Sequence, residues 1–137
     1  MGSLKQLNTY ICEVRDKPFE WGKHDCFIFS NSAFKAYHGY GYADEWIGKY
    51  LKDGKPMLPS QLRSEFGAND FEEAIATKLQ EISYVPPRGA LVATKRAERW
   101  HIGYALGLSV GMKAAFLSQK GLIYLPFDDV VKAWIPR

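Results

Sequence analysis

Residues 19–34, FEWGKHDCFIFSNSAF, place a cysteine where a glycine-containing turn gives way to an apolar segment. Asp25 is a suitable helix N-cap, because its carboxylate can accept a hydrogen bond from a backbone N–H of the first turn. The segment that follows, CFIFSNSAFKAYH, is apolar around much of its circumference, which is typical of a central helix. We therefore expect a core helix that begins at or near Cys26.

A cysteine at a helix N-terminus has two interpretations. The unpaired N–H groups and the positive end of the helix dipole lower a thiol pKa, which favours a nucleophile. Free cysteine is also among the most buried residue types, and a buried structural thiol is inert. The segment alone leaves both interpretations of Cys26 open.

His101 is the leading candidate for a general base that would act on this thiol. The stretch RWHIGYALG, residues 99–107, alternates bulky side chains with small ones. His101, Gly103 and Ala105 share the small face, and we expect that face to approach the cysteine helix. A surface histidine on an edge strand is the alternative. His24 is the rival base, and we expect it to lie in the turn before the helix.

The layout of the chain predicts an α+β fold, with helices first and then an antiparallel sheet. Ser3 can cap a first helix, ADEWIGKYL suggests a short helix, and Ser60 and Asn69 can cap two more. After these come five short β-rich runs: EISYV, ALVAT, WHIGYALGLSV, KAAFLS and GLIYLP. The tail DDVVKAWIPR fits either a helical turn or a strand. We expect one domain over residues 1–137.

Composition argues against two classes of protein, those that bind nucleic acids and those that span a membrane. The chain has 137 residues, 47% hydrophobic and 24% charged, which is typical of a globular domain. Its net charge of +3 comes from scattered basic residues, which argues against a nucleic-acid surface. No apolar run approaches the ~20 residues of a membrane span, and no signal-peptide pattern occurs, so we expect synthesis in the cytosol and no membrane span.

The cysteine and histidine spacing predicts neither a disulfide nor a metal site. Cys12 and Cys26 lie in different expected helices, and cytosolic proteins seldom form structural disulfides. The two cysteines and three histidines lack the paired spacing of zinc ligands. The chain also lacks a phosphate-binding glycine-rich loop, so we expect no cofactor.

Three segments resemble the NlpC-like cysteine peptidases. Residues 19–34 are similar to the Trp-Gly…Asp-Cys segment of that family, and PRGALVAT is similar to its Gly-Asp-Leu-Val strand. HIGYALG is similar to the family's His-Val-Gly-Ile-Tyr-Leu-Gly strand. The resemblance covers nearly the full chain and is greatest to the small phage-tail and prophage branch. It implies a papain-like α+β core in which the nucleophile helix packs on an antiparallel sheet.

The same resemblance implies a function. It implies amide hydrolysis in peptidoglycan stem peptides, with Cys26 as nucleophile, His101 as base, and Trp21 and Trp100 beside the substrate groove. The protein would be made in the host cytoplasm and would be a component of the virion tail tip. Its partners would be tail hub or tail-tip proteins and the wall peptide.

Three departures from the family pattern affect the chemistry. Phe19 replaces a tyrosine before the Trp-Gly pair, and Phe27 replaces the serine after the cysteine. The polar residue that would orient the base falls on Ala114 or Ala115. The groups that we expect to orient or support the base instead are Ser118, Gln119 or a backbone carbonyl, with Asp25 and His24 nearby.

A second alignment of the strand is also open. ALGLSVGMKAAF, residues 105–116, fits the family's histidine strand and its hairpin about as well as HIGYALG does. In that alignment Ala105 takes the histidine position, and no base remains on the strand. The chain would then be a catalytically degenerate relative that serves as a structural or assembly component of a tail tip.

Overall fold

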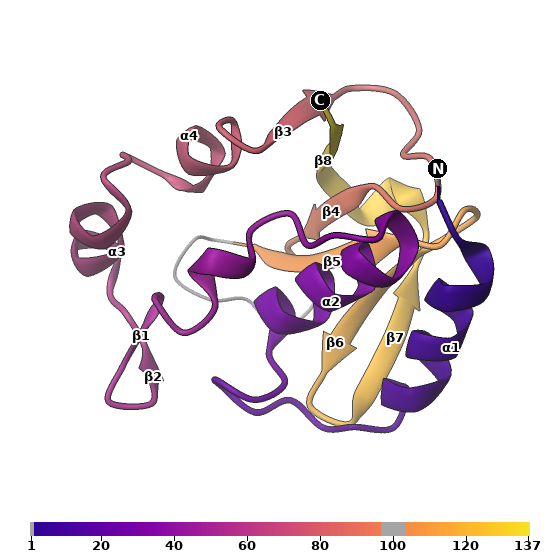
Figure 1. The fold of residues 1–137 in the computed structure, drawn as a ribbon, viewed down its shortest axis with the longest axis horizontal. Helices are drawn as coiled ribbons and strands as arrows, with labels where there is room; N and C mark the ends of the chain where they lie inside the picture. Colours follow the sequence, from indigo (N-terminus) through magenta and orange to yellow (C-terminus); the bar gives the residue numbers. More distant parts are fainter. Residues whose placement is uncertain (1, 97–103) are drawn as a thin grey trace.

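The computed structural model describes residues 2–96 and 104–137, which form an α+β fold, as predicted (Figure 1). Helix α2 packs against β5 and β6 of a six-stranded antiparallel sheet, and α1 packs against α2. The sheet order is β3-β8-β4-β5-β6-β7. The strands are β3 (Leu79–Ile82), β4 (Leu91–Thr94), β5 (Ala105–Ser109), β6 (Ala114–Ser118), β7 (Gly121–Leu125) and β8 (Val130–Pro136).

The first two helices begin where the sequence predicts. Helix α1 spans Leu4–Val14, and the Ser3 hydroxyl accepts a hydrogen bond from the Gln6 N–H. Helix α2 spans Cys26–His38 and is capped by Asp25. It ends at Gly39, whose φ of 89° is accessible at little cost only without a side chain.

The two later helices begin at other residues than predicted. Helix α3 (Pro59–Phe66) starts after Leu58, not at Ser60, because proline favours the first helical position and the Gln61 side chain accepts the Leu58 N–H. Helix α4 (Phe71–Ile75) is capped by Asp70, not by Asn69. The Asp70 carboxylate accepts the N–H of the third helical residue, which satisfies a donor that the helix leaves unpaired.

The segment between α2 and α3 contains less helix than predicted. Only a 3₁₀ turn, η1 (Asp44–Trp46), forms there, because Gly48 takes a positive φ of 81° that breaks helical geometry. The stretch after it contains a small hairpin, β1 (Leu51–Lys52) with β2 (Lys55–Pro56). The C-terminal tail is a strand, β8, which follows the 3₁₀ turn η2 (Phe127–Asp129) and lies between β3 and β4.

Strands β5 and β6 form a close hairpin beneath α2. Gly107 pairs with Phe116 in this ladder, and a Cβ atom on Gly107 would lie 2.1 Å from the carbonyl oxygen of Ala115. No side chain fits at that distance. The close approach of the two strands therefore requires glycine at this position.

The two faces of β5 point into different buried clusters. Leu106 and Leu108 lie in the cluster that contains Cys26, whereas Ala105 lies with Phe116 in the cluster on the other face. The expectation that the small face of this strand meets the cysteine helix is therefore wrong at Ala105, because the larger leucines fill the space under α2. His101 and Gly103 lie outside the described residues.

Polar contacts join α2 to the segment that follows it. The buried side chain of Asn31 accepts a hydrogen bond from the Ala43 N–H (3.0 Å) and donates one to Asp44 (2.6 Å). One residue earlier, Ser30 shares a buried hydrogen bond with the Tyr42 hydroxyl (2.8 Å). These bonds fix the start of the segment that leads to α3 and α4.

We expect Asn31→Ala to lower the free energy of unfolding by about 1–3 kcal/mol, because the Ala43 N–H is left buried without its partner. Urea unfolding measures the change. The matched control is Asn69→Ala, which removes an exposed amide bonded to Glu73 and should cost within about 0.5 kcal/mol. Equal effects of the two substitutions would show that the Asn31 bonds contribute no more than a surface contact.

Candidate functional site

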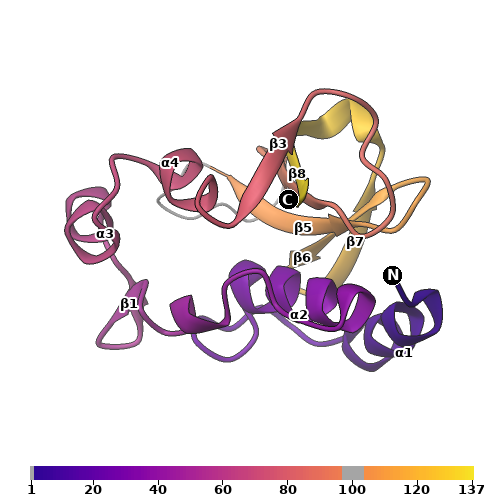
Figure 2. The ribbon, with the colours of Figure 1, turned by 45° about the horizontal axis from the view of Figure 1, so that its top comes forward.

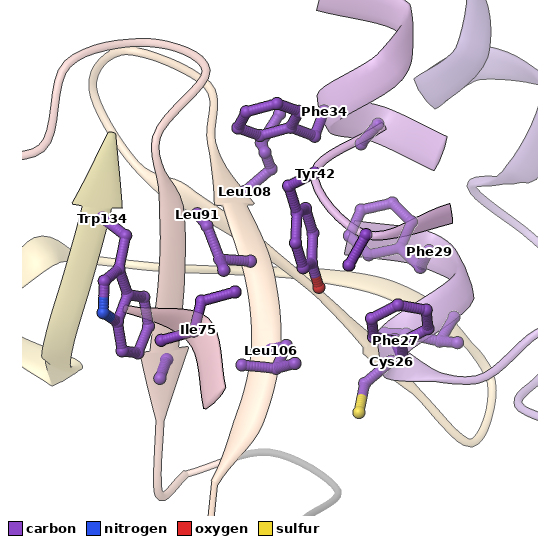
Figure 3. Close-up of a cluster of buried hydrophobic side chains, with 14 of the residues drawn as sticks. Cys26, Phe27, Phe29, Phe34, Tyr42, Ile75, Leu91, Leu106, Leu108 and Trp134 are labelled. Atoms are coloured by element: carbon purple, nitrogen blue, oxygen red, sulfur yellow. The ribbon is translucent and has the colours of Figure 1, made fainter. Parts of the chain in front are cut away.

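Cys26 is the first residue of α2 and is fully buried, with 0% of its surface exposed. Its side chain points from α2 toward the sheet, in the cluster that contains Leu106 (Figure 3). Burial raises the pKa of the thiol to about 12, and a hydrogen bond with the Leu106 backbone offsets this only in part. Because a raised pKa keeps the neutral form, Cys26 is a protonated thiol near neutral pH.

Asp25 shapes the turn before the helix. Its buried carboxylate accepts hydrogen bonds from the Gly22 N–H (3.0 Å) and the Ile28 N–H (2.9 Å) and from the Tyr50 hydroxyl (2.6 Å). One bond caps α2, one closes the turn and one reaches the loop after η1. The predicted supporting residue therefore holds three parts of the backbone in place around Cys26.

Tyr50 is a buried site residue that the sequence analysis missed. The Phe19 side chain lacks the hydroxyl that the family pattern puts near the thiol. The Tyr50 hydroxyl is buried in this region instead and donates a hydrogen bond to the Asp25 carboxylate. Burial, with the neighbouring carboxylate, raises the Tyr50 pKa far above its usual range, so this hydroxyl stays a donor. It lies 25 residues from Asp25 in the chain, and no spacing rule links the two positions.

His24 lies in the turn before α2, as predicted. Its backbone bridges to Glu20, and the side chain is buried at 7% exposure, 6.4 Å from the Phe29 ring. Burial, helped by Lys17, lowers its pKa, so the ring is neutral near pH 7. Nε2 has no hydrogen-bond partner within residues 2–96 and 104–137. The histidine is therefore held by ring packing in the turn.

The remaining predicted site residues make other contacts or lie outside the described residues. Trp21 packs in the turn, with its ring 4.8 Å from Phe19 and 6.5 Å from Tyr50. The Ser118 hydroxyl donates to the Gly121 carbonyl (2.7 Å) and so closes the β6–β7 turn, in which Gln119 is exposed. His101 and Trp100 lie outside the described residues.

A pocket of ≈160 Å³ opens beside the start of α2, between η1, α3 and α4. We call it the aromatic pocket, because aromatic rings dominate its lining. Phe27, the residue after the cysteine, is one wall, and Arg63 and Asp70 add the charged groups. The aromatic residues that line it are Phe27, Trp46, Tyr50, Phe66 and Phe71. The pocket therefore suits an apolar group more than a charged one.

Neither a metal site nor a membrane-spanning helix is found in the described part of the chain. No group of three or more His, Cys, Asp or Glu side chains in residues 2–96 and 104–137 is arranged to hold a metal ion. Among the helices that the structure describes, none is long and apolar enough to cross a bilayer.

Tyr50→Phe should lower the free energy of unfolding by about 1–3 kcal/mol, because the buried Asp25 carboxylate loses a charge-assisted hydrogen bond while the ring stays in place. Thermal and urea unfolding give the change. Tyr124→Phe is the control, since that side chain is 46% exposed on β7 and should be nearly neutral. A neutral Tyr50→Phe would mean that the Asp25 carboxylate does not depend on this donor.

Comparison with known proteins gives one match. No curated protein and no solved structure matches the chain. A family model described as a domain of unknown function, DUF6950, matches residues 4–135, which include the turn, the cysteine helix and all of the sheet except the last residue of β8. The chain therefore belongs to the DUF6950 family.

Proposed function

We propose that this protein is a catalytically degenerate relative of the NlpC-like peptidases, with a papain-like core, that serves as a structural or assembly component of a phage tail tip. The observation that carries the proposal is the state of Cys26. The thiol is fully buried and its pKa is raised to about 12, whereas a cysteine nucleophile needs an accessible thiolate.

Strand β5 presents no base to Cys26 from its described residues. The β5 side chains that share the cluster with Cys26 are Leu106 and Leu108, whereas Ala105, which the second alignment puts at the family's histidine position, lies in the cluster on the other face. The assignment to a phage tail, and tail hub proteins as partners, rests on the sequence resemblance alone.

An active peptidase is the second candidate, and one observation favours it. Cys26 begins a capped helix that packs on β5, which is the arrangement that the resemblance implies for a nucleophile. His101, outside the described residues, would be the base. Catalysis would require a rearrangement that exposes the thiol and lowers its pKa. The two candidates therefore differ in thiol reactivity and in hydrolysis of stem peptides.

We expect Cys12 to react with a thiol reagent at least about a hundredfold faster than Cys26 near neutral pH, because Cys12 is exposed and Cys26 is buried and protonated. The measurement is the rate of thiol modification with the variants Cys12→Ser and Cys26→Ala, which isolate one cysteine each. Since the Cys26 pKa is near 12, its slow rate should persist on raising the pH to about 9.

Denaturant provides the control for this measurement. Unfolding should make the single thiol of Cys12→Ser react at the rate of an ordinary cysteine, which shows that the fold alone protects it. A Cys26 that reacts faster than Cys12 in the folded protein would contradict the structural role and favour the peptidase.

Wild type and Cys26→Ala should give the same result in a wall-digestion assay on purified peptidoglycan, with no release of stem-peptide amines above background. The substitution should also leave incorporation into tails unchanged, because an alanine fits the space of the thiol. Copurification with tail hub proteins measures incorporation.

The opposite pattern identifies an enzyme. If wild type digests the wall and Cys26→Ala does not, the degenerate assignment is wrong. His101→Ala should then lose about 10²–10⁴-fold in rate as the missing general base, while His24→Ala should lose less.

A further inference from the structure

The aromatic pocket has the size of one side chain. Its volume is ≈160 Å³, and an apolar cavity of about 150 Å³ is large enough to bind benzene. Its rings stand at angles to one another: Trp46 meets Phe66 edge-on at 5.3 Å, and Phe27 lies tilted against Tyr50 at 5.3 Å. Such walls favour a flexible, polarisable group that contacts several rings at once.

Helices α3 and α4 beside the pocket carry more acidic than basic residues, although the whole chain has a net charge of +3. Lys78, whose Nζ lies 6.0 Å from the Trp46 ring of the pocket, is paired with Glu45 (2.7 Å). Residues 59–75, which contain α3 and α4, carry one basic residue, Arg63, and four acidic ones. Asp70 lines the pocket itself, and Glu73 begins the exposed side of α4. An apolar group that carries positive charge beside it is therefore the complementary partner.

The turn between β5 and β6 presents such a group. Met112 is 88% exposed, the most exposed of the large hydrophobic side chains that the structure describes. Lys113 is exposed next to it, and the exposed Arg88 is held against the turn because its Nε donates to the Val110 carbonyl (3.2 Å). Residues 83–90 and 109–114 contain no acidic residue. The hairpin tip, residues 110–113, thus presents the exposed Met112 side chain beside two cations, Lys113 and Arg88.

We propose that the protein associates with itself head to tail, with Met112 of one copy seated in the aromatic pocket of a second copy. The methionine side chain is unbranched, and its sulfur makes favourable contacts with aromatic rings. Lys113 and Arg88 then face the acidic surface of α3 and α4. The size and polarity of the Met112 side chain match the pocket, and the charges of Lys113 and Arg88 are opposite to the net charge of α3 and α4.

The two surfaces lie at opposite ends of the molecule. Figures 1 and 2 place α3 and α4 at one end of the long axis and the orange turn beyond β5 at the other. One copy therefore cannot fill its own pocket, and the contact joins different surfaces on the two partners. Contacts of this kind build rings or open chains rather than two-fold dimers.

A single hairpin tip buries little surface, so the association is weak, with a dissociation constant on the order of 0.1–1 mM. It goes beyond the proposed function and does not require it, because the pocket and the turn have the same chemistry in an active peptidase. Failure of the phage-tail or degenerate-enzyme proposal would leave it standing.

Sedimentation of the purified full chain up to about 1 mM tests the proposal. Wild type should show a concentration-dependent rise in average mass. Ala74→Leu fills the pocket from α4 and should weaken the association at least about tenfold, which is the loss expected when an apolar anchor is excluded. Ala76→Leu is the matched control, since it adds the same side chain at an exposed position that does not line the pocket.

Met112→Glu tests the other surface without disturbing the fold, because the side chain is already exposed. It should also sediment as a monomer. A mixture of Met112→Glu and Ala74→Leu should form a dimer and nothing larger, because the first variant keeps its pocket and the second keeps its methionine.

Three outcomes would overturn the proposal. They are a wild type that stays monomeric at about 1 mM, an association that Met112→Glu leaves unchanged, and a mixture of the two variants that stays monomeric. The sedimentation result for Ala74→Leu is interpreted only if the circular dichroism and melting temperature of the variant match those of wild type. If it fails to fold, Phe66→Ala, which removes a ring from the pocket, takes its place, and mixing it with Met112→Glu gives the same test.

Discussion

The buried carboxylate of Asp25 is the interaction on which the rest of the structure depends. It accepts hydrogen bonds from the Gly22 N–H, the Ile28 N–H and the Tyr50 hydroxyl, and so fixes the turn, the helix start and the loop after η1 together. A buried carboxylate is tolerated only when such donors replace its water shell. Because three separate segments supply the donors, the position of Cys26 is determined by the tertiary fold and not by α2 alone.

The same arrangement determines whether the Cys26 thiol is ionised near neutral pH. A helix N-terminus stabilises a negative charge by about 0.3–1 kcal/mol. The rise of the Cys26 pKa from 9.0 to about 12 corresponds to roughly 4 kcal/mol in the opposite direction, with burial as its largest cause. The cost of burying the thiolate is therefore larger than the stabilisation that the helix dipole provides. A cysteine at the head of a helix is a nucleophile only where solvent or a cationic partner reaches it, and at this site the Leu106 side of β5 fills that space.

The sequence predicted the features that depend on local chemistry. The caps at Ser3 and Asp25 and most strand positions follow from spacing and side-chain type. The face of β5 could not be predicted, because alternation separates two faces without saying which one meets a helix. The Tyr50–Asp25 hydrogen bond and the aromatic pocket could not be predicted from the sequence either, because they join residues far apart in the chain.

Phe27 follows the thiol in α2 and also lines the aromatic pocket. By resemblance a serine would stand at this position, next to the nucleophile. The phenylalanine instead packs its ring 5.6 Å from Tyr42 and 5.3 Å from Tyr50, and forms one wall of the aromatic pocket. A serine side chain is too short to reach these rings, so the pocket in its present shape requires the aromatic residue. The position that lacks a hydroxyl beside the thiol is thus the one that supplies a wall of the pocket.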